Sequence, residues 1–306
     1  MYKLTFSFYQ FELIQKISVL FRSIFAFIIL SFFIISCSTE VEIEWKDEPQ
    51  KYVVNCLLTP DEPVKLYAFK TSPILEDTAF FSDGMDVEIY KNETLAWTGS
   101  GTGKGEYPIP VYAEAGAKFK IIMKDKNGFA VSAEDTLPEK VKIKDATNFY
   151  PFYIENYYTT YGKITLTFTD EPNKSNYYEI VILNESNGIV QTLKVKNPVI
   201  TYDIDHNPNP TGTLLFTDEL FEGKQITLDI FSDCHEPTVV LKNVSRNYYE
   251  YRKSINIHFY NQNVERYDIY HMFKGDPVEL YSNITNGIGI FAGYTQDIKV
   301  CTNINQ

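Results

Sequence analysis

The sequence is poor in the residues that most often carry metal and redox chemistry. It holds only four cysteines and four histidines among 306 residues, and it contains no CxxC, no HExxH and no close histidine pair. A structural zinc site, a thioredoxin-like motif and a zinc-protease motif therefore have no support in the sequence. We expect no metal and no cofactor.

Positive charge is also scarce. Lys and Arg number 28 against 40 Asp and Glu, so the formal net charge is −12. Clustered cationic side chains favour binding to a phosphate backbone, and no such cluster occurs along this chain. The composition therefore argues against nucleic acid as a partner, and the negative charge mainly favours solubility.

The single long apolar run is too short to span a bilayer. Residues 24–35 are apolar except for Ser31, whereas a spanning helix needs about 20 residues. Basic residues precede the run, and Ile34-Ile35-Ser36-Cys37 closes it. Positive charge, a short apolar helix and a small residue before a cysteine are typical of a bacterial lipoprotein signal. We predict a signal peptide over residues 1–36 and lipidation of Cys37, with an uncleaved membrane anchor as the alternative.

The chain after the leader is long enough for two compact domains. Removing residues 1–36 leaves 270 residues, of which residues 37–50 form a polar stretch. The acidic residues of this stretch are Glu40, Glu42, Glu44, Asp47 and Glu48. We predict an extended acidic tether that holds the folded part away from a membrane.

The remaining residues have a β-rich pattern. Tyr and Phe number 23 and 22, and many of them stand among Val, Ile and Thr in short runs bounded by Gly, Asn, Asp and Pro. Residues 163–168 alternate strictly, and Asn187-Gly188 is a strong hairpin signal. The pattern predicts an all-β fold with two antiparallel, Ig-like β-sandwich units, residues 51–139 and residues 140–306.

One segment near the C-terminus departs from the β pattern. In residues 244–256 apolar and aromatic side chains recur at helical spacing, and Ser245 is placed to accept a hydrogen bond from a first-turn amide. We predict a short helix here. Two further strands, residues 279–284 and 289–294, are expected after it.

Three cysteines follow Cys37, and they permit one disulfide with three pairings. Cys56 stands in an apolar strand pattern, which favours a buried free thiol. The favoured disulfide is therefore the one between Cys234 and Cys301.

Two groups of residues offer catalytic or metal chemistry. Asp203, Asp205 and His206 could hold a divalent cation, and Asp233-Cys234-His235 places a thiol beside an imidazole. A turn explains the first group, because Asn-Pro pairs follow it. The second group is a poor nucleophile and base, because adjacent residues on a strand point to opposite faces. We therefore expect a protein that is not an enzyme.

Aromatic residues indicate a function more specifically than these catalytic or metal candidates do. A group that stands among polar residues consists of Tyr150, Phe152, Tyr153, Tyr157, Tyr158 and Tyr161. Such rings can stack on sugars or anchor a protein partner, although rings also fill small β cores. The group is a candidate binding surface.

The order of these segments resembles one family, the Bacteroidetes lipoproteins grouped as domain of unknown function 4249. The matching segments are residues 52–60, 87–90, 248–251, 281–284 and 287–294. Cys56 stands where the family usually carries Gly, and Asn286-Gly287 replaces a more glycine-rich pair. The resemblance implies an accessory lipoprotein that works with a TonB-dependent outer-membrane receptor in nutrient uptake, and it brings no catalytic residues.

The resemblance also bears on location. Glu40, Glu42 and Glu44 are similar to the acidic signal that routes such lipoproteins to the cell surface, so we expect a lipid-anchored, surface-exposed protein of the outer membrane. Two other functions stay open from the residues alone. One is a glycan-binding surface lipoprotein using the aromatic group, and the other is a fimbrial or adhesin subunit.

Overall fold

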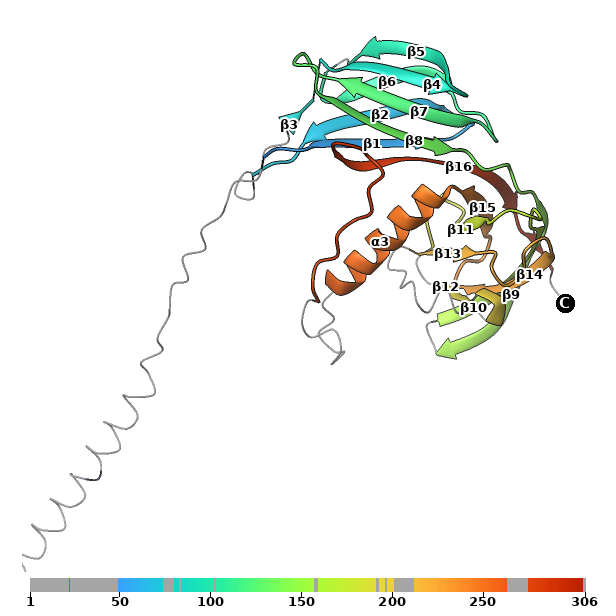
Figure 1. Ribbon diagram of the computed structural model, residues 1–306. Helices are drawn as coiled ribbons and strands as arrows, with labels where there is room; N and C mark the ends of the chain where they lie inside the picture. The colour runs from blue at the N-terminus through green and yellow to red at the C-terminus, as the bar shows by residue number, and fades with distance from the viewer. Residues whose placement is uncertain are drawn as a thin grey trace, which may run out of the picture. The chain divides into compact units, whose positions relative to one another are not determined.

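The computed structural model shows a β-rich body (Figure 1). The described residues are 22, 49–73, 80–82, 84–101, 103–156, 159–190, 193–195, 197–200, 212–262 and 275–304. Residues 48–306 form one compact unit, separate from residues 1–47. Cys37 and nearly all of the predicted leader and tether lie outside the described residues. No helix within the described ranges is both long enough and apolar enough to cross a membrane.

Three sheets contain the described strands. The eight-stranded sheet contains β1 (Tyr52–Leu58), β2 (Pro63–Lys70), β3 (Phe80–Phe81), β6 (Glu106–Tyr112), β11 (Tyr177–Leu183), β13 (Thr213–Thr217), β15 (Thr238–Val244) and β16 (Ile288–Val300). The four-stranded sheet contains β4 (Asp86–Lys91), β5 (Thr94–Ser100), β7 (Lys118–Lys124) and β8 (Ala130–Thr136). The five-stranded sheet contains β9 (Ile143–Asn156), β10 (Thr159–Thr169), β12 (Leu193–Val195), β14 (Gln225–Ser232) and β17 (Thr302–Asn303).

The eight-stranded sheet takes part in both sandwiches. Its order is β13-β11-β15-β16-β1-β2-β3, with β6 also paired to β2. The first half of β16 runs parallel to β1, from the Val53–Ile288 pair to the Leu58–Gly293 pair. The second half runs antiparallel to β15, from Tyr294 to Val300. One strand from the end of the chain thus joins the N-terminal and C-terminal parts of the sheet.

Two buried cores lie between the sheets. The first joins the β1, β2 and β6 part of the large sheet to the four-stranded sheet, with Leu66, Tyr107, Phe119 and Phe291 among its residues. The second joins the β11, β13 and β15 part to the five-stranded sheet. Alternating burial along strands such as β2 and β7 produces these cores, because successive side chains point to opposite faces.

The helix α3 (Arg246–Gln262) covers the outer face of the large sheet (Figure 1). Tyr248 and Tyr249 pack there with Leu215, Ile290 and Ala292 in a third, smaller cluster. The Ser245 hydroxyl accepts a hydrogen bond from the Tyr248 backbone N–H at 3.2 Å, so the predicted N-cap is confirmed.

The all-β sandwich prediction is confirmed, but one predicted strand is wrong. Residues 279–284 form no strand; they run beside α3, where the Tyr281 backbone N–H donates to Ser254 Oγ at 2.9 Å. Tyr281 packs against the third cluster and Ile284 enters the first core, so this segment buries apolar side chains without pairing as a strand. The division between residues 51–139 and 140–306 stays a prediction, and β16 crosses it by pairing with β1.

Candidate functional site

The structure brings four of the six predicted binding aromatics together at one end of β9 and β10. The Tyr153 and Tyr161 rings stack with centroids 5.0 Å apart, and the Phe152 ring lies 5.5 Å from that of Phe231. Tyr150 makes an edge contact with the His235 ring at 4.9 Å. Tyr157 and Tyr158 lie outside the described residues. We call Tyr150, Phe152, Tyr153, Tyr161 and Phe231 the β9–β10 aromatic cluster.

Much of this cluster packs on itself. Tyr161 is only 3% exposed and Phe231 5%, whereas Phe152 is 43% exposed. The Lys163 ammonium group lies 5.4 Å from the Phe152 ring centroid, a cation–π contact. The cluster therefore offers Phe152, beside a lysine, as its exposed ring for a ligand.

Cys56, Cys234 and Cys301 are all free thiols in the structure. Cys234 and Cys301 share the second core, and Cys56 lies in the first. Burial raises the pKa of Cys301 to about 12, and the neighbouring Cys234 adds to that rise. The two thiols are therefore neighbours without a bond between them, and the Cys234–Cys301 disulfide stays a prediction.

The candidate nucleophile pair is separated by the fold. Cys234 is buried in the second core, and burial raises its pKa, so the thiol form is favoured. His235 is exposed and turned toward Tyr150. Asp203, Asp205 and His206 lie outside the described residues. Among the residues that are described, no group of three or more His, Cys, Asp or Glu is arranged to hold a metal ion.

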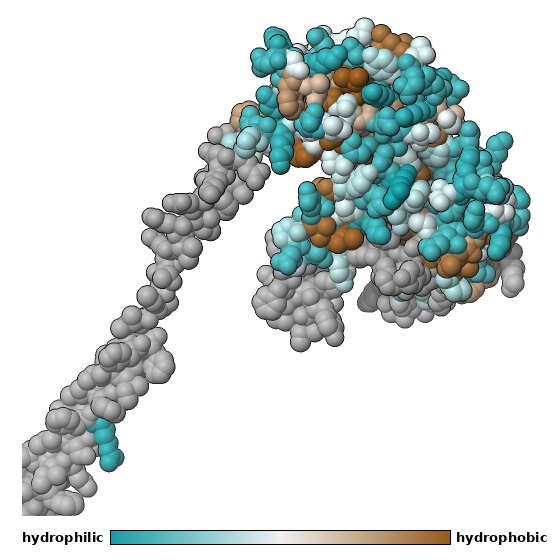
Figure 2. Space-filling model, in the orientation of Figure 1, coloured by the Kyte–Doolittle hydropathy of each residue, from teal (hydrophilic) through white to brown (hydrophobic). Residues whose placement is uncertain are grey.

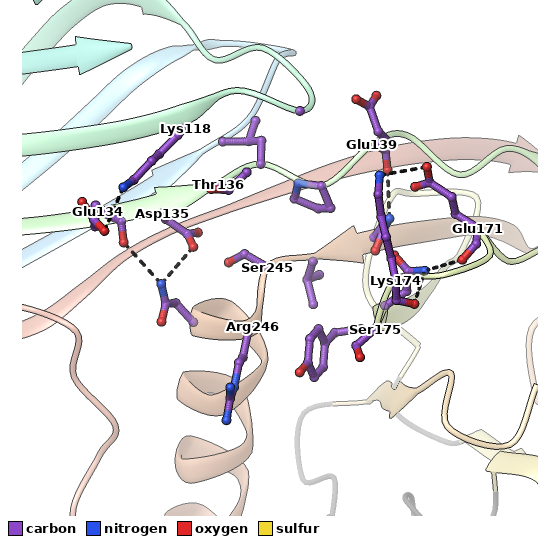
Figure 3. Close-up of a pocket in the computed structure, with 18 residues that line it drawn as sticks. Lys118, Glu134, Asp135, Thr136, Glu139, Glu171, Lys174, Ser175, Ser245 and Arg246 are labelled. Atoms are coloured by element: carbon purple, nitrogen blue, oxygen red, sulfur yellow. Dashed lines mark hydrogen bonds and ion pairs between the residues drawn. The ribbon is translucent and has the colours of Figure 1, made fainter. Parts of the chain in front are cut away.

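A cavity of about 730 Å³ opens beside the N-terminus of α3 (Figure 3). It is lined by Gly116, Lys118 and Glu171 together with residues 134–139, 174–177 and 243–247. Asp135, near the end of β8, and Ser245, just before the helix, point toward one another in its wall. We call it the Asp135 cavity. Four separate segments of the chain meet here.

Asp135 in its wall is held by several hydrogen bonds. Its carboxylate accepts the Gly293 backbone N–H at 2.7 Å and the Asn247 side-chain amide at 2.9 Å, and it also accepts a hydrogen bond from the Ser245 hydroxyl. Burial raises the pKa of Asp135 to about 6, although these donors act in the opposite direction. The carboxylate ties β8 to β16 and to the start of α3.

The rim of the cavity carries charges of both signs that largely pair with each other. Lys118 lies 3.0 Å from Glu134, and Lys174 lies 2.8 Å from Glu171. Arg246 makes only a long contact, 3.9 Å, with Glu250 on the next helical turn. The cavity therefore has no strong net field of either sign.

A second polar group lies between α3 and the large sheet. Glu179 of β11 is 1% exposed, and its carboxylate accepts hydrogen bonds from Lys242 at 2.8 Å, Tyr248 at 2.7 Å and Arg252 at 3.1 Å. Burial alone would raise the pKa of Glu179, but the two cations lower it to about 2. This buried network fastens the helix to the sheet.

Sequence patterns did not indicate the Asp135 cavity. The Ser245 cap and the end of a strand near Leu137-Pro138-Glu139 are visible in the sequence as separate local signals. Gly293 donates to Asp135 across 158 positions of the chain, so only long-range strand pairing brings them together.

The fold defines a class of protein, namely an all-β protein with two sandwich cores, one shared sheet and a helix on its outer face. On the side shown in Figure 2, hydrophobic residues form separate patches on a mainly hydrophilic surface.

The chain belongs to the family described as domain of unknown function (DUF4249), which it matches over residues 38–299. No curated protein matches it. A similar solved structure is a β-glucuronidase from glycoside hydrolase family 2, at 12% identity and a TM-score of 0.20. The match covers 78% of this chain but only 22% of the glycosidase chain, and at this TM-score it carries no weight for function.

Proposed function

We propose that this protein is a non-enzymatic lipoprotein of the outer membrane, anchored through Cys37, that serves as an accessory or binding subunit of a TonB-dependent nutrient-uptake receptor. The observation that carries the proposal is the extent of the family match. It begins at residue 38, directly after the proposed lipidated cysteine, and runs almost to the end of the chain. Residues 1–37 lie outside the match, as expected for a cleaved leader and a lipidated cysteine that precede the family domain.

The described fold is compatible with a binding role. Phe152 is held on β9, and the cavity lies where the end of β8 and the junction of β15 with α3 meet the residues before β11. Acyl chains at Cys37 would hold the body at the membrane, because stable anchoring needs more than one chain.

Crosslinking in intact cells tests the receptor partnership. Full-length tagged protein is treated with an amine-reactive crosslinker, purified in detergent, and its adducts are identified by mass spectrometry. We expect an adduct with a TonB-dependent receptor barrel, and we expect the Cys37→Ala protein to lose both lipidation and the adduct. Absence of any receptor adduct from the lipidated protein would contradict the proposal.

Protease treatment of intact cells tests the location. A surface-exposed protein is cut while a periplasmic marker stays whole. Protection of this protein until the outer membrane is opened would place it on the inner side.

A second candidate function is glycan binding at the cell surface. It is favoured by Phe152, whose exposed ring beside Lys163 could stack on a sugar. Affinity electrophoresis in polysaccharide gels tests it: the wild-type protein should be retarded and Phe152→Ala should migrate freely. Equal mobility of the two proteins in every gel would remove the aromatic cluster from consideration.

A further inference from the structure

One end of the first sandwich carries exposed aromatic and apolar side chains. It is the end at which the chain enters β1, beside β3 and the β7–β8 turn (Figure 1). Phe81 of β3 is 49% exposed, Phe129 of the turn is 46% exposed, and Ile288 at the start of β16 is 36% exposed. Large apolar side chains that are left in water at one place indicate an interaction surface.

Strand register places Phe81 and Ile288 in one row on the same face of the large sheet. Phe81 pairs with Phe69. Val53 pairs with both Phe69 and Ile288, so the row crosses β3, β2, β1 and β16. The row is about 14 Å long, because neighbouring strands lie about 4.8 Å apart. These side chains thus form a continuous apolar strip.

Phe129 joins this strip through Tyr52. The two rings stack with centroids 5.6 Å apart, and the Tyr52 hydroxyl donates to Asp125 at 2.9 Å. Tyr52, Phe80 and Phe81 line one hollow of about 400 Å³. We call the following residues the Phe81 face: Tyr52, Phe69, Phe80, Phe81, Phe129 and Ile288. Strand pairing and ring stacking hold these side chains in place before any partner arrives.

Lysines stand among the rings of the Phe81 face. Lys51 and Lys126 are exposed, and the Lys70 ammonium group lies 4.9 Å from the Tyr52 ring centroid. Asp86 is also exposed at this end, so charges of both signs are present and apolar contact is the main attraction. Rings with lysines beside them suit the headgroup region of a membrane, where the rings bury apolar surface and the ammonium groups stay hydrated.

The chain that leads to the proposed anchor enters the body at this face. Lys51 directly precedes β1, and Tyr52, the first residue of β1, belongs to the face. A chain of the length between Cys37 and Lys51 reaches at most about 50 Å when fully extended. Acyl chains on Cys37 therefore keep the Phe81 face within reach of lipid, which raises the effective concentration of membrane at the face.

We propose that the Phe81 face lies against the surface of the membrane that holds the Cys37 acyl chains. The rings of Phe81 and Phe129 enter the headgroup region, and the lysines lie at the level of the phosphates. This inference rests on the lipid anchoring proposed above, and it adds a second membrane contact that orients the folded body. Lipid is favoured over a second copy or the receptor, because the anchor brings lipid to this face in every molecule.

The test uses the acylated protein, purified in detergent and reconstituted into phosphatidylcholine vesicles without a receptor. A fluorophore is attached at Lys126→Cys, beside the face, or at Ser186→Cys, on an exposed turn of the second sandwich. Cys56, Cys234 and Cys301 are at most 7% exposed and resist labelling in the folded protein. Phosphatidylcholine with a nitroxide on its headgroup quenches a fluorophore that touches the lipid surface. We expect quenching at position 126 and none at position 186.

Removing the two exposed rings should detach the face. Phe81→Glu combined with Phe129→Glu should lower the equilibrium constant for membrane contact at least about 10-fold and abolish quenching at position 126, because each ring loses its apolar burial. Leu95→Glu combined with Ile298→Glu is the control, since these side chains are 50% and 56% exposed outside the face. This control should keep the quenching. Circular dichroism and thermal melting confirm that both variants are folded.

Three results would overturn the inference. They are no quenching at position 126, equal quenching at positions 126 and 186, or quenching that survives the loss of Phe81 and Phe129. Energy transfer between labelled molecules in detergent that disappears in the Phe81→Glu, Phe129→Glu protein would assign the face to a second copy instead.

Mass spectrometry of the same preparation and receptor crosslinking in cells separate the two proposals. Acylated protein that shows no quenching rejects the membrane face alone. A missing receptor adduct with quenching intact rejects the receptor partnership alone. Protein without acyl chains contradicts the anchoring on which both proposals rest.

Discussion

At the scale of the residue, some buried polar groups have hydrogen-bond partners and others have none within the described residues. Asp170 is 1% exposed and accepts hydrogen bonds from Tyr178 at 2.5 Å and from the Gly223 backbone N–H at 2.6 Å. Asn256 of α3 is fully buried, and neither its amide nitrogen nor its amide oxygen has a partner within the described residues. Satisfied groups specify a structure, whereas an unsatisfied amide only costs free energy.

Asn256→Leu should therefore stabilise the protein. We expect the free energy of unfolding to rise by about 1–2 kcal/mol, since the substitution removes an unpaired buried amide and adds apolar burial of similar volume. Urea denaturation measures it. Asn127→Leu, at an exposed position, is the control and should change stability little. A loss of stability in Asn256→Leu would show that the amide has a partner such as ordered water.

Asp135 should make stability depend on pH between about 4 and 6. Its folded-state pKa, about 6, lies above the ordinary value of 3.8, so the folded protein holds the proton more tightly than the unfolded chain. Stability from this group is therefore full below pH 4 and is lost as pH rises through 6, by at most about 3 kcal/mol.

The Asp135→Asn protein isolates this contribution. The free energy of unfolding, measured by urea at several pH values, should fall more between pH 4 and 6 in the wild type than in the variant. Parallel profiles for the two proteins would mean that the three donors around Asp135 keep it ionised at low pH.

At the scale of the element, α3 depends on one buried carboxylate more than on its own sequence. The helix has no acidic residue in its first turn and no basic residue in its last, so the helix dipole is left without help from charged side chains. Glu179 binds Arg252 from the helix and Lys242 from β15 at the same time. The helix position is thus determined by a sheet residue.

Glu179→Gln should destabilise the docking of α3. Removing the charge leaves Lys242, whose side chain is only 17% exposed, beside a neutral amide, and we expect a loss of about 3 kcal/mol. In this variant, hydrogen exchange should be accelerated more in the α3 amides than in the β7 amides. Glu134→Gln, in an exposed ion pair with Lys118, is the control and should change stability by less than about 1 kcal/mol. Unchanged protection of α3 would show that the tyrosine contacts alone hold the helix.

At the scale of the whole molecule, β16 makes the two sandwiches depend on each other. Phe291 lies in the first core although it stands near the C-terminal end of the sequence. Residues 294–300 of the same strand pair with β15 beside the second core. Gly289 has φ +115°, and a Cβ there would come within 2.1 Å of the Val54 carbonyl oxygen. The close approach of β16 to β1 therefore requires glycine at this position.

Phe291→Ala should destabilise the N-terminal core even though the residue lies at the other end of the chain. Phe291 is fully buried, so we expect a loss of about 3–5 kcal/mol. Calorimetry measures it, with exchange of the β7 amides as the local readout. Ile298→Ala, in the same strand but 56% exposed, is the control. An N-terminal core that keeps full protection in Phe291→Ala would show that β16 is an addition to that sandwich rather than part of it.

The sequence by itself determined the local structure of this protein. Alternating side chains set the strands, Ser245 set the start of α3, and the apolar run before Cys37 set the predicted leader, because each signal acts between residues close in the chain. Only the tertiary structure decided which strands share a sheet. The parallel β1–β16 pair, the Glu179 network and the Asp135 cavity join segments from distant parts of the chain, and no local pattern encodes such meetings. Residues 279–284 illustrate the limit: a short run that contains a few apolar side chains suits a strand or an irregular segment beside a helix, and only the neighbours in the fold distinguish the two.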